Sequence, residues 1–537
     1  MTFLAVVAWA ALGSAQPVGG ATLAVAGLGF DGHARLGAWT PVWIDVTAGT
    51  DVDGTVVIDV PTPTGQPVVR YGAPVRAAAG APVRVFVPAI FFESRTPGTV
   101  HLEAAGHRLA SQPLPRVRPV DEIVVVLSSE PLGAEATVAR TGRVDVAYVA
   151  AEMLPPVWQT YEAVRLLVVR TLDERRLDDA QRIAVRDWVW TGGRILMMPE
   201  GDDTRHLSGP TLGPLRRDAR AGRLGRGHVI VWTRDPADPS VRGNAADVPA
   251  WETVLEAGAV GAAPSLEPAV PAGRPVPLRV HLVAGAMILL YVLLVRRVSR
   301  FLALLQPVPV ATFVVMVLVA TAAAVRLSVL ARRDASGVVS ATMVEMLPGT
   351  GHGLLRLHAR VVSSHGGAFA ITAPPGVLVR PAPPASVTIV TGPTVQISGQ
   401  GAGLQLSGVA VVPLPVSGTY HAGAGGVSIR ITNRSGRRIE HPWVYMDSRV
   451  QMIAPIGESA QVSLDASRWQ PADRLQRTEP HHPLLVWTFL RLESDAILRG
   501  TRNWLVGWWR DPALALMWDG RPEAPLQLIL VPLSASP

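Results

Sequence analysis

The region that decides the fold is residues 166–199, LLVVRTLDERRLDDAQRIAVRDWVWTGGRILMMP. Its two ends are formed by apolar runs, at 165–169 and 194–198, which have the composition of parallel strands that are buried on both faces. Between them a capping aspartate, Asp178 or Asp179, begins a helix that ends at the next Gly-Gly pair. This strand–helix–strand order predicts an α/β doubly wound fold.

The same pattern extends over residues 119–258, which are predicted to form one α/β domain. Three further apolar runs, at Glu122–Leu127, 144–149 and 228–232, have the length and composition of buried strands. On the predicted helix, apolar residues recur at helical spacing and would cover one side of the sheet.

β structure is predicted on both sides of this domain. Residues 17–118 contain short strand-like runs separated by turn signals such as Asp53-Gly54, which predicts a small β-sandwich. Residues 337–537 return to short β segments and are predicted to form one or more β-rich domains. A Gly/Ala/Pro-rich linker occupies residues 259–277.

The composition excludes several classes of protein. The 537 residues are enough for three or four domains of roughly 100–200 residues each. Hydrophobic residues make up 48% and charged residues 17%, and the mean hydropathy is +0.28, which excludes a mostly disordered chain. All 49 basic residues are Arg and they are spread along the chain, so we expect no nucleic-acid partner.

Three apolar runs predict targeting and membrane segments. Residues 1–15 contain a run too short to span a bilayer, followed by small residues, and are predicted to be a cleaved signal peptide. A buried first strand is the alternative, because no basic residue precedes the run. Residues 278–296 and 308–327 are long enough to cross ~30 Å of hydrocarbon as helices, and we expect a transmembrane hairpin rather than buried core helices.

The predicted location follows from the signal peptide. Arg residues flank both ends of the hairpin in nearly equal number, so the charge bias alone does not set the orientation. If the signal peptide is cleaved, residues 16–278 are exported and the loop 297–307 is cytoplasmic. We therefore expect a bacterial inner (cytoplasmic) membrane protein with its large domains on the periplasmic or extracytoplasmic side.

Three stretches together resemble a group of uncharacterised bacterial envelope membrane proteins with a class I glutamine amidotransferase-like domain. Residues 166–199 resemble the strand–helix–Gly-Gly–strand segment of that domain. Residues 30–42 and 431–464 are similar to the β regions of the same group. The resemblance implies a β domain, an amidotransferase-like domain, transmembrane helices and a further β domain, in that order.

The absence of cysteine separates this chain from active amidotransferases. Those enzymes use a Cys on a tight strand-to-helix turn, with a His and a Glu downstream, whereas this chain has no Cys. The resemblance therefore implies architecture and location but not the reaction. Disulfides and thiolate metal sites are excluded for the same reason.

The best chemical candidate follows the strand that ends at Met198. Glu200, Asp202, Asp203 and His206 would lie at the carboxyl end of that strand, where open α/β sheets bind ligands. Carboxylates and an imidazole can hold Mg²⁺ or Ca²⁺, or position a water molecule. A solvated acidic turn is the favoured alternative, since Asp and Gly are ordinary turn residues. Whether this turn binds metal stays open.

Other polar residues near the strand ends are weaker candidates. Asp173 and Glu174 either face the same crevice or begin the loop into the next helix. Ser128-Ser129 can act as a nucleophile or bind an anion, although no Gly-x-Ser-x-Gly turn is present.

Histidine, arginine and tryptophan clusters complete the list of candidates. The sequence contains the following: His352, His358 and His365; His481-His482; Arg216, Arg217, Arg220, Arg223 and Arg226; Trp504, Trp508 and Trp509. The spacing of the first three histidines does not predict a zinc site, and the pair at 481–482 is a weak metal candidate in a loop. The arginines can contact anionic lipid or polysaccharide, but a flexible surface loop is the favoured interpretation. The tryptophans are expected to pack inside the last β domain and not to contact a membrane or a sugar.

The function predicted from these patterns is non-enzymatic. We expect a membrane-anchored cell-envelope protein that binds or scaffolds envelope protein partners through its β and amidotransferase-like domains, with no cofactor. The alternative is a membrane-tethered hydrolase or metal-dependent enzyme that uses the acidic turn at Glu200.

Overall fold

The computed structural model is mostly β: strands account for 62% of the described residues and helices for 11%. It describes residues 20–62, 68–93, 98–128, 144–170, 172, 174–198, 209–218, 222–231, 297, 337–362, 368–382, 386–400, 404–423, 426–471, 488, 503–518, 521–523 and 526–535.

Two sheets enclose the N-terminal core. The first is antiparallel and contains β1 (Thr22–Leu28), β3 (Trp39–Thr47) and β6 (Val83–Ile90). The second includes β4 (Val52–Pro61), β5 (Val68–Ala77), β7 (Thr99–Ala104) and β8 (His107–Pro113). A short parallel pair, β2 (His33–Ala34) and β9 (Arg118–Pro119), lies beside them. Alternate residues point between the sheets, and Ile44, Ile58 and Tyr71 are fully buried there.

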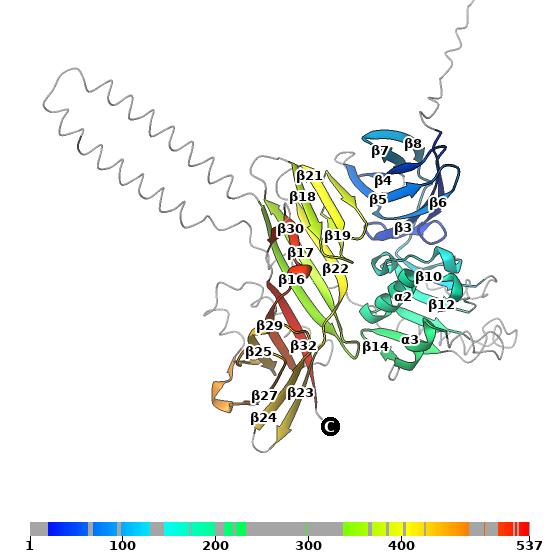
Figure 1. Ribbon diagram of the computed structural model, residues 1–537. Coiled ribbons are helices and arrows are strands. Elements are labelled where there is room, and N and C mark those ends of the chain that lie inside the picture. Colours follow the sequence, from blue (N-terminus) through cyan, green and yellow to red (C-terminus); the bar gives the residue numbers. More distant parts are fainter. Residues whose placement is uncertain are drawn as a thin grey trace, which may run out of the picture.

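The second sheet does not end at β5 but continues into strands from the C-terminal half. β20 (Val387–Val390) pairs in parallel with β5, from Val387 opposite Val69 to Val390 opposite Gly72. The added strands are β20, β21 (Val395–Gln400), β18 (Ala368–Ala373), β30 (Leu516–Trp518) and β31 (Arg521–Glu523). The result is a nine-stranded sheet that joins segments far apart in the sequence (Figure 1).

A six-stranded sheet follows the N-terminal strands. Its order is β11 (Val144–Tyr148), β10 (Glu122–Leu127), β12 (Val164–Val169), β13 (Arg194–Met197), β15 (Gly227–Val231) and β14 (Arg223–Leu224). The first five strands are parallel, and β14 pairs antiparallel with β15. Residues 123–127 are buried along their whole length, which explains the uninterrupted apolar run in the sequence.

The predicted helix is confirmed as α2 (Asp179–Thr191), and its ends follow from local chemistry. The Asp178 carboxylate accepts from the Gln181 backbone N–H, and the Gln181 side chain accepts from the Asp178 N–H. Gly192 ends the helix with a φ of 131°, which favours glycine. A second, shorter α-helix among the described residues is α3 (Leu212–Asp218).

A twelve-stranded sheet forms the rest of the C-terminal half. Its main path is β19 (Leu378–Pro381), β22 (Gln405–Pro413), β17 (His352–Val362), β16 (Gly337–Leu347), β32 (Leu526–Ala535), β29 (Asn503–Arg510), β25 (Glu440–Met446), β26 (Arg449–Met452) and β28 (Gln470–Pro471). A branch contains β23 (Val416–Gly423), β24 (Gly426–Asn433) and β27 (Ser459–Leu464). β32 connects the two parts, because it pairs in parallel with both β16 and β23.

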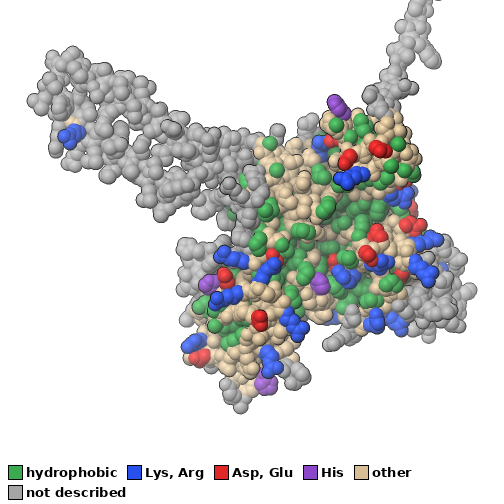
Figure 2. All heavy atoms as spheres, in the orientation of Figure 1, with side chains coloured by type: hydrophobic (Ala, Val, Ile, Leu, Met, Phe, Trp, Pro, Cys, Tyr) green, Lys and Arg blue, Asp and Glu red, His purple; other side chains and the backbone are tan. Residues whose placement is uncertain are grey.

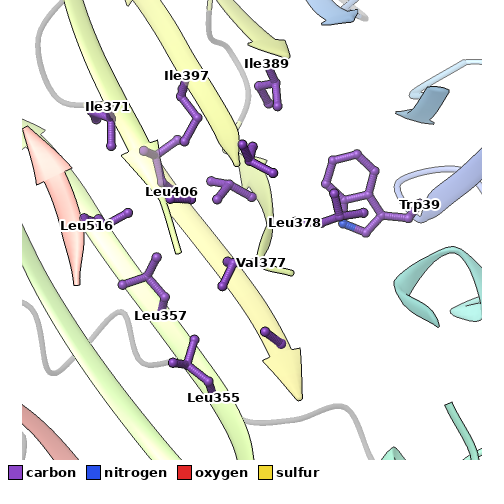
Figure 3. Packing of buried hydrophobic residues seen from close by; sticks show 14 of the residues in the cluster. Trp39, Leu355, Leu357, Ile371, Val377, Leu378, Ile389, Ile397, Leu406 and Leu516 are labelled. Atoms are coloured by element: carbon purple, nitrogen blue, oxygen red, sulfur yellow. The ribbon is translucent and has the colours of Figure 1, made fainter. Parts of the chain in front are cut away.

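One hydrophobic core connects the N-terminal sheets to the C-terminal sheets. Trp39 of β3 and Leu378 of β19 belong to the same buried cluster. In Figure 3 the indole of Trp39 points toward the C-terminal strands that carry Leu378 and Ile389. Figure 2 shows hydrophobic side chains gathered over the centre of this face. Burial of apolar surface contributes about 25 cal/mol per Å², so a shared core strongly couples the two halves.

Polar contacts also hold the parallel sheet to the C-terminal strands. Gln159, in the 3₁₀ helix η2 (Trp158–Tyr161), donates from Nε2 to Gly376 O at 2.9 Å and to Val409 O at 2.8 Å. Glu162 forms ion pairs with Arg35 on one side and Arg380 on the other. The segment between β11 and β12 therefore contacts both the N-terminal and the C-terminal β-sheets, which are together called the β framework below.

Replacing Gln159 by alanine is expected to lower the free energy of unfolding by about 1–3 kcal/mol, because two part-buried hydrogen bonds, to the carbonyl groups of Gly376 and Val409, are lost. Urea unfolding of the full-length chain measures this change. Gln396→Ala is the matched control, because Gln396 is exposed on β21; equal effects of the two substitutions would contradict the assignment.

The predicted fold class was wrong. The structure is mostly β, whereas we expected an α/β doubly wound domain and a helical hairpin between β domains. Buried apolar strands indicate a parallel sheet but do not fix what connects them. The connection from β11 to β12 contains the 3₁₀ helices η1 (Ala151–Met153) and η2, whereas a doubly wound fold connects its parallel strands by α-helices. Further 3₁₀ helices among the described residues are η3 (Glu174–Arg176), η6 (Ala466–Arg468) and η7 (Pro512–Leu514).

The predicted transmembrane hairpin and inner-membrane location are also corrected. Within the described ranges, no helix combines the length and the apolar character that crossing a membrane requires. The predicted spans, 278–296 and 308–327, and the predicted signal peptide, 1–15, lie outside the described residues. Hydropathy measures how apolar a run is but not what covers it, which is why the sequence pattern alone misled.

Candidate ligand-binding edge of the parallel sheet

The order of the parallel strands creates a switch point between β10 and β12. After β10 the chain adds β11 on one side of it, and then crosses to the other side to add β12. In open parallel sheets, ligands bind outside the carboxyl ends of the strands at such a point. This edge is therefore the place where the fold itself predicts a binding site.

Ser128 and Arg170 are the first residues beyond these two strands. The strands end together, since Leu127 pairs with Val169 and the Arg170 N–H lies 3.3 Å from Leu127 O. Both side chains are half-buried. They place a hydroxyl group and a guanidinium, two polar groups that can form hydrogen bonds, at the switch point. Ser129, the second residue of the predicted Ser pair, lies outside the described residues.

Glu174 has a structural role at this edge. Its carboxylate is buried and accepts hydrogen bonds from the Thr211 N–H at 2.6 Å and the Leu212 N–H at 3.1 Å. It therefore caps the first turn of α3. A Cβ on Gly209 would lie 2.4 Å from the Glu174 carboxyl carbon, so a glycine is needed for this close approach. Asp173 lies outside the described residues.

The acidic turn remains a prediction. Glu200, Asp202, Asp203 and His206 lie outside the described residues, so their relative positions are not given by the structure. Among the residues that are described, no group of three or more His, Asp or Glu side chains is arranged to hold a metal ion.

The histidines of β17 do not converge. His352 packs its ring against Trp190 of α2, with 4.6 Å between ring centroids, and its Nδ1 lies 2.9 Å from Thr350 O. His358 is buried farther along the strand. His365 and the His481-His482 pair lie outside the described residues. The described members therefore serve packing in two separate places.

The basic segment divides between the surface and an internal contact. Arg216, Arg217 and Arg223 are exposed, but the first two lie on α3 and the third on β14 and not in the surface loop that was expected. Arg220 lies outside the described residues. Arg226 instead forms an ion pair with Glu345 of β16, whose side chain is 5% exposed. The neighbouring glycines serve close packing against α2, because a Cβ on Gly227 would lie 1.9 Å from Val189 O.

The tryptophan cluster of β29 is part of the core. Trp504 and Trp509 are buried, which confirms the packing interpretation for these two residues. The Arg437 guanidinium lies over the Trp509 ring, 5.6 Å from its centroid, and pairs with Asp511. Trp508 is half-buried on the same strand.

Burial raises the pKa of Asp187, which lies beside the Trp190–His352 contact, although Arg186 opposes the shift. Arg186 donates to Asp187 Oδ1 from Nε at 3.0 Å and Nη2 at 2.8 Å. Its guanidinium also lies 4.3 Å from the Trp190 ring centroid. This group of side chains therefore stabilises the contact between α2 and the β16–β17 turn.

Sequence reasoning missed a cluster of charged side chains that surrounds a buried histidine on the N-terminal strands. His101 of β7 is fully buried and is surrounded by Asp59, Arg70, Glu103 and Arg108. These residues come from four strands, and only their alternation along each strand pointed to a shared face. Without the strand pairing, no spacing in the sequence brings them together.

A family model for a domain of unknown function, DUF8726, matches residues 23–116. The match covers the strands from β1 to β8 and does not reach the parallel sheet. It describes the part of the chain that contains the His101 cluster, and it assigns no activity.

No curated protein matches this chain. Among solved structures, a β-glucuronidase from glycoside hydrolase family 2 is 9% identical, with a TM-score of 0.15; the alignment covers 84% of this chain and 62% of that one. The chain thus spans less than two thirds of that enzyme chain, and a TM-score this low supports no argument about fold or activity.

Proposed function

We propose that this chain is a non-enzymatic binding or scaffolding protein whose parallel sheet offers a binding edge held by a β framework. The observation that supports this most is the strand order, which places a switch point between Ser128 and Arg170. The resemblance to amidotransferase-like domains stays a prediction, and the missing cysteine excludes the corresponding reaction.

The framework supports the scaffolding part of the proposal. The N-terminal and C-terminal halves share one nine-stranded sheet and one hydrophobic core. Gln159 and Glu162 attach the parallel sheet to both halves. Binding sites on a rigid support lose less conformational entropy when they engage a partner.

A photo-crosslinking residue in place of Ser128 tests the proposal in the full-length chain. We expect it to capture one defined partner or ligand, and we expect the same probe in place of Ser398, exposed on β21, to capture none. Adding Arg170→Ala should reduce capture by about tenfold or more, because the charged donor at the switch point is lost.

Two outcomes would overturn the proposal. Equal capture from positions 128 and 398 would show that the strand ends are not a site. Turnover of an ester, phosphoester or glycoside by the purified chain with Mg²⁺, lost in Asp202→Ala and Asp203→Ala, would establish the enzymatic alternative.

A further inference from the structure

His101 lies in an environment that suits neither neutral form of its ring. Its Nε2 is 3.0 Å from Glu103 Oε1, which favours an N–H at this atom. The same Nε2 is 3.1 Å from Arg70 Nη2 and 3.5 Å from Arg108 Nη2, which favour a lone pair. A neutral imidazole carries one donor and one acceptor nitrogen, so Nε2 cannot satisfy both neighbours.

The second ring nitrogen adds to this conflict. His101 Nδ1 is buried without a hydrogen bond, and Asp59 Oδ2 lies 3.7 Å away. Imidazolium would donate from both nitrogens, toward Glu103 and Asp59. These two carboxylates are also the partners of Arg70, with Nε 3.0 Å from Asp59 Oδ1 and Nη2 2.6 Å from Glu103 Oε1. Protonation of the ring therefore competes directly with Arg70.

Arg70 also lies where the N-terminal and C-terminal halves of the molecule join. This junction, the pairing of residues 69–72 of β5 with residues 387–390 of β20, is called the seam below. On β5 its backbone pairs with Asp59 of β4 on one side and with Thr388 of β20 on the other. Beyond the four paired residues of β20, the Thr391 N–H donates to Gly72 O at 2.7 Å. A change that displaces Arg70 thus acts on a residue whose own backbone takes part in the pairing of β5 with β20.

We propose that His101 is a proton-sensitive switch whose protonation releases Arg70 and loosens the seam between β5 and β20. The charged groups that face the ring are Asp59 on β4, Arg70 on β5, Glu103 on β7 and Arg108 on β8. With neutral His101 their formal charges cancel, and the added proton leaves the cluster with an excess positive charge. Arg108 and Arg70 are the groups that can move outward into solvent.

The direction of the pH effect follows from burial. Burial lowers the pKa of His101; the Asp59 and Glu103 carboxylates oppose this, and Arg108 and Arg70 reinforce it. The stabilisation given by the neutral ring is therefore present above the pKa of an unfolded histidine, about 6.5. It is lost as the pH falls through the folded pKa, because an opened cluster binds the proton more tightly.

Hydrogen exchange of the full-length chain tests the switch. We expect amide protection at 68–72 and 387–391, after correction for intrinsic exchange rates, to fall by up to about tenfold per pH unit below about pH 6.5. In His101→Gln the fall should be much smaller, while His421→Gln, at an exposed position on β23, should behave as the unmodified chain. Protection in β24 should not depend on His101.

The switch would be overturned if seam protection were independent of pH, or if His101→Gln left its pH dependence unchanged. If His101→Gln does not fold, a second variant and an NMR titration of the unmodified chain test whether His101 controls the seam. His101→Asn is the second variant, and the imidazole of the unmodified chain can be titrated by nitrogen NMR. A His101 pKa at or above about 6.5 would contradict the proposal, and a lower one coupled to seam exchange would support it.

Discussion

Replacing Gly227 by alanine is expected to cost about 3 kcal/mol or more and to disrupt the packing of α2 on the parallel sheet. The added Cβ would lie 1.9 Å from Val189 O and 2.4 Å from Gly193 O. Both obstacles are backbone atoms at the end of α2, so no side-chain rotation relieves the clash. Urea unfolding followed by tryptophan fluorescence measures the loss, since Trp188 and Trp190 lie on α2.

Gly457→Ala is the matched control for this substitution. Nothing lies within 4 Å of a Cβ at Gly457, so alanine there should change the free energy of unfolding by about 0.5 kcal/mol or less. A Gly227→Ala chain as stable as the Gly457→Ala chain would show that the β14–β15 turn does not pack against α2 as described.

The local pattern around these glycines was predictable only in part. The capping aspartate, the helix and its Gly-Gly end are confirmed, because they depend on neighbouring residues. Nothing in the sequence supplied a reason for the glycines at 222–227. That reason is the close approach of α2: the Arg226 N–H donates to Trp190 O at 2.9 Å, and Gly225 has a φ of 62°.

Long-range strand pairing could not be predicted. β5 and β20 have ordinary alternating patterns, and nothing in either segment specifies the other as its neighbour. The parallel pairing of β32 with β16 is equally hidden. Alternation sets which face of a strand is buried, but the partner is chosen by packing across the whole molecule.

Candidate sites were subject to the same limit. Glu174 was expected either at the crevice or at the start of a loop, and its actual role is to cap α3 from a buried position. A carboxylate after a strand has the same appearance in the sequence in each case. The His101 cluster was missed entirely, because its members become neighbours only when β4, β5, β7 and β8 pair.

Removing the Glu345 carboxylate is expected to have the other large effect, a loss of about 3–5 kcal/mol in Glu345→Ala. Glu345 is buried on β16, pairs with Arg226 from the β14–β15 turn, and lies 3.9 Å from Arg356 Nη2. Without the carboxylate, the Arg226 guanidinium, whose side chain is 15% exposed, would remain largely buried without that counter-charge. Desolvation of a charge is costly where no partner offsets it.

Glu440→Ala separates the effect of burial from that of charge. Glu440 pairs with Arg510 at 3.9 Å, but the side chains are 40% and 62% exposed, so this loss should be below about 1 kcal/mol. Urea unfolding of both variants gives the comparison, and similar losses would contradict the buried junction. Combining Glu345→Leu with Arg226→Met and Arg356→Met should recover much of the stability lost in Glu345→Ala, because both buried guanidinium groups that face the carboxylate are then removed with it. Such recovery would show that this ion pair fixes the parallel sheet to β16 without being a net source of stability.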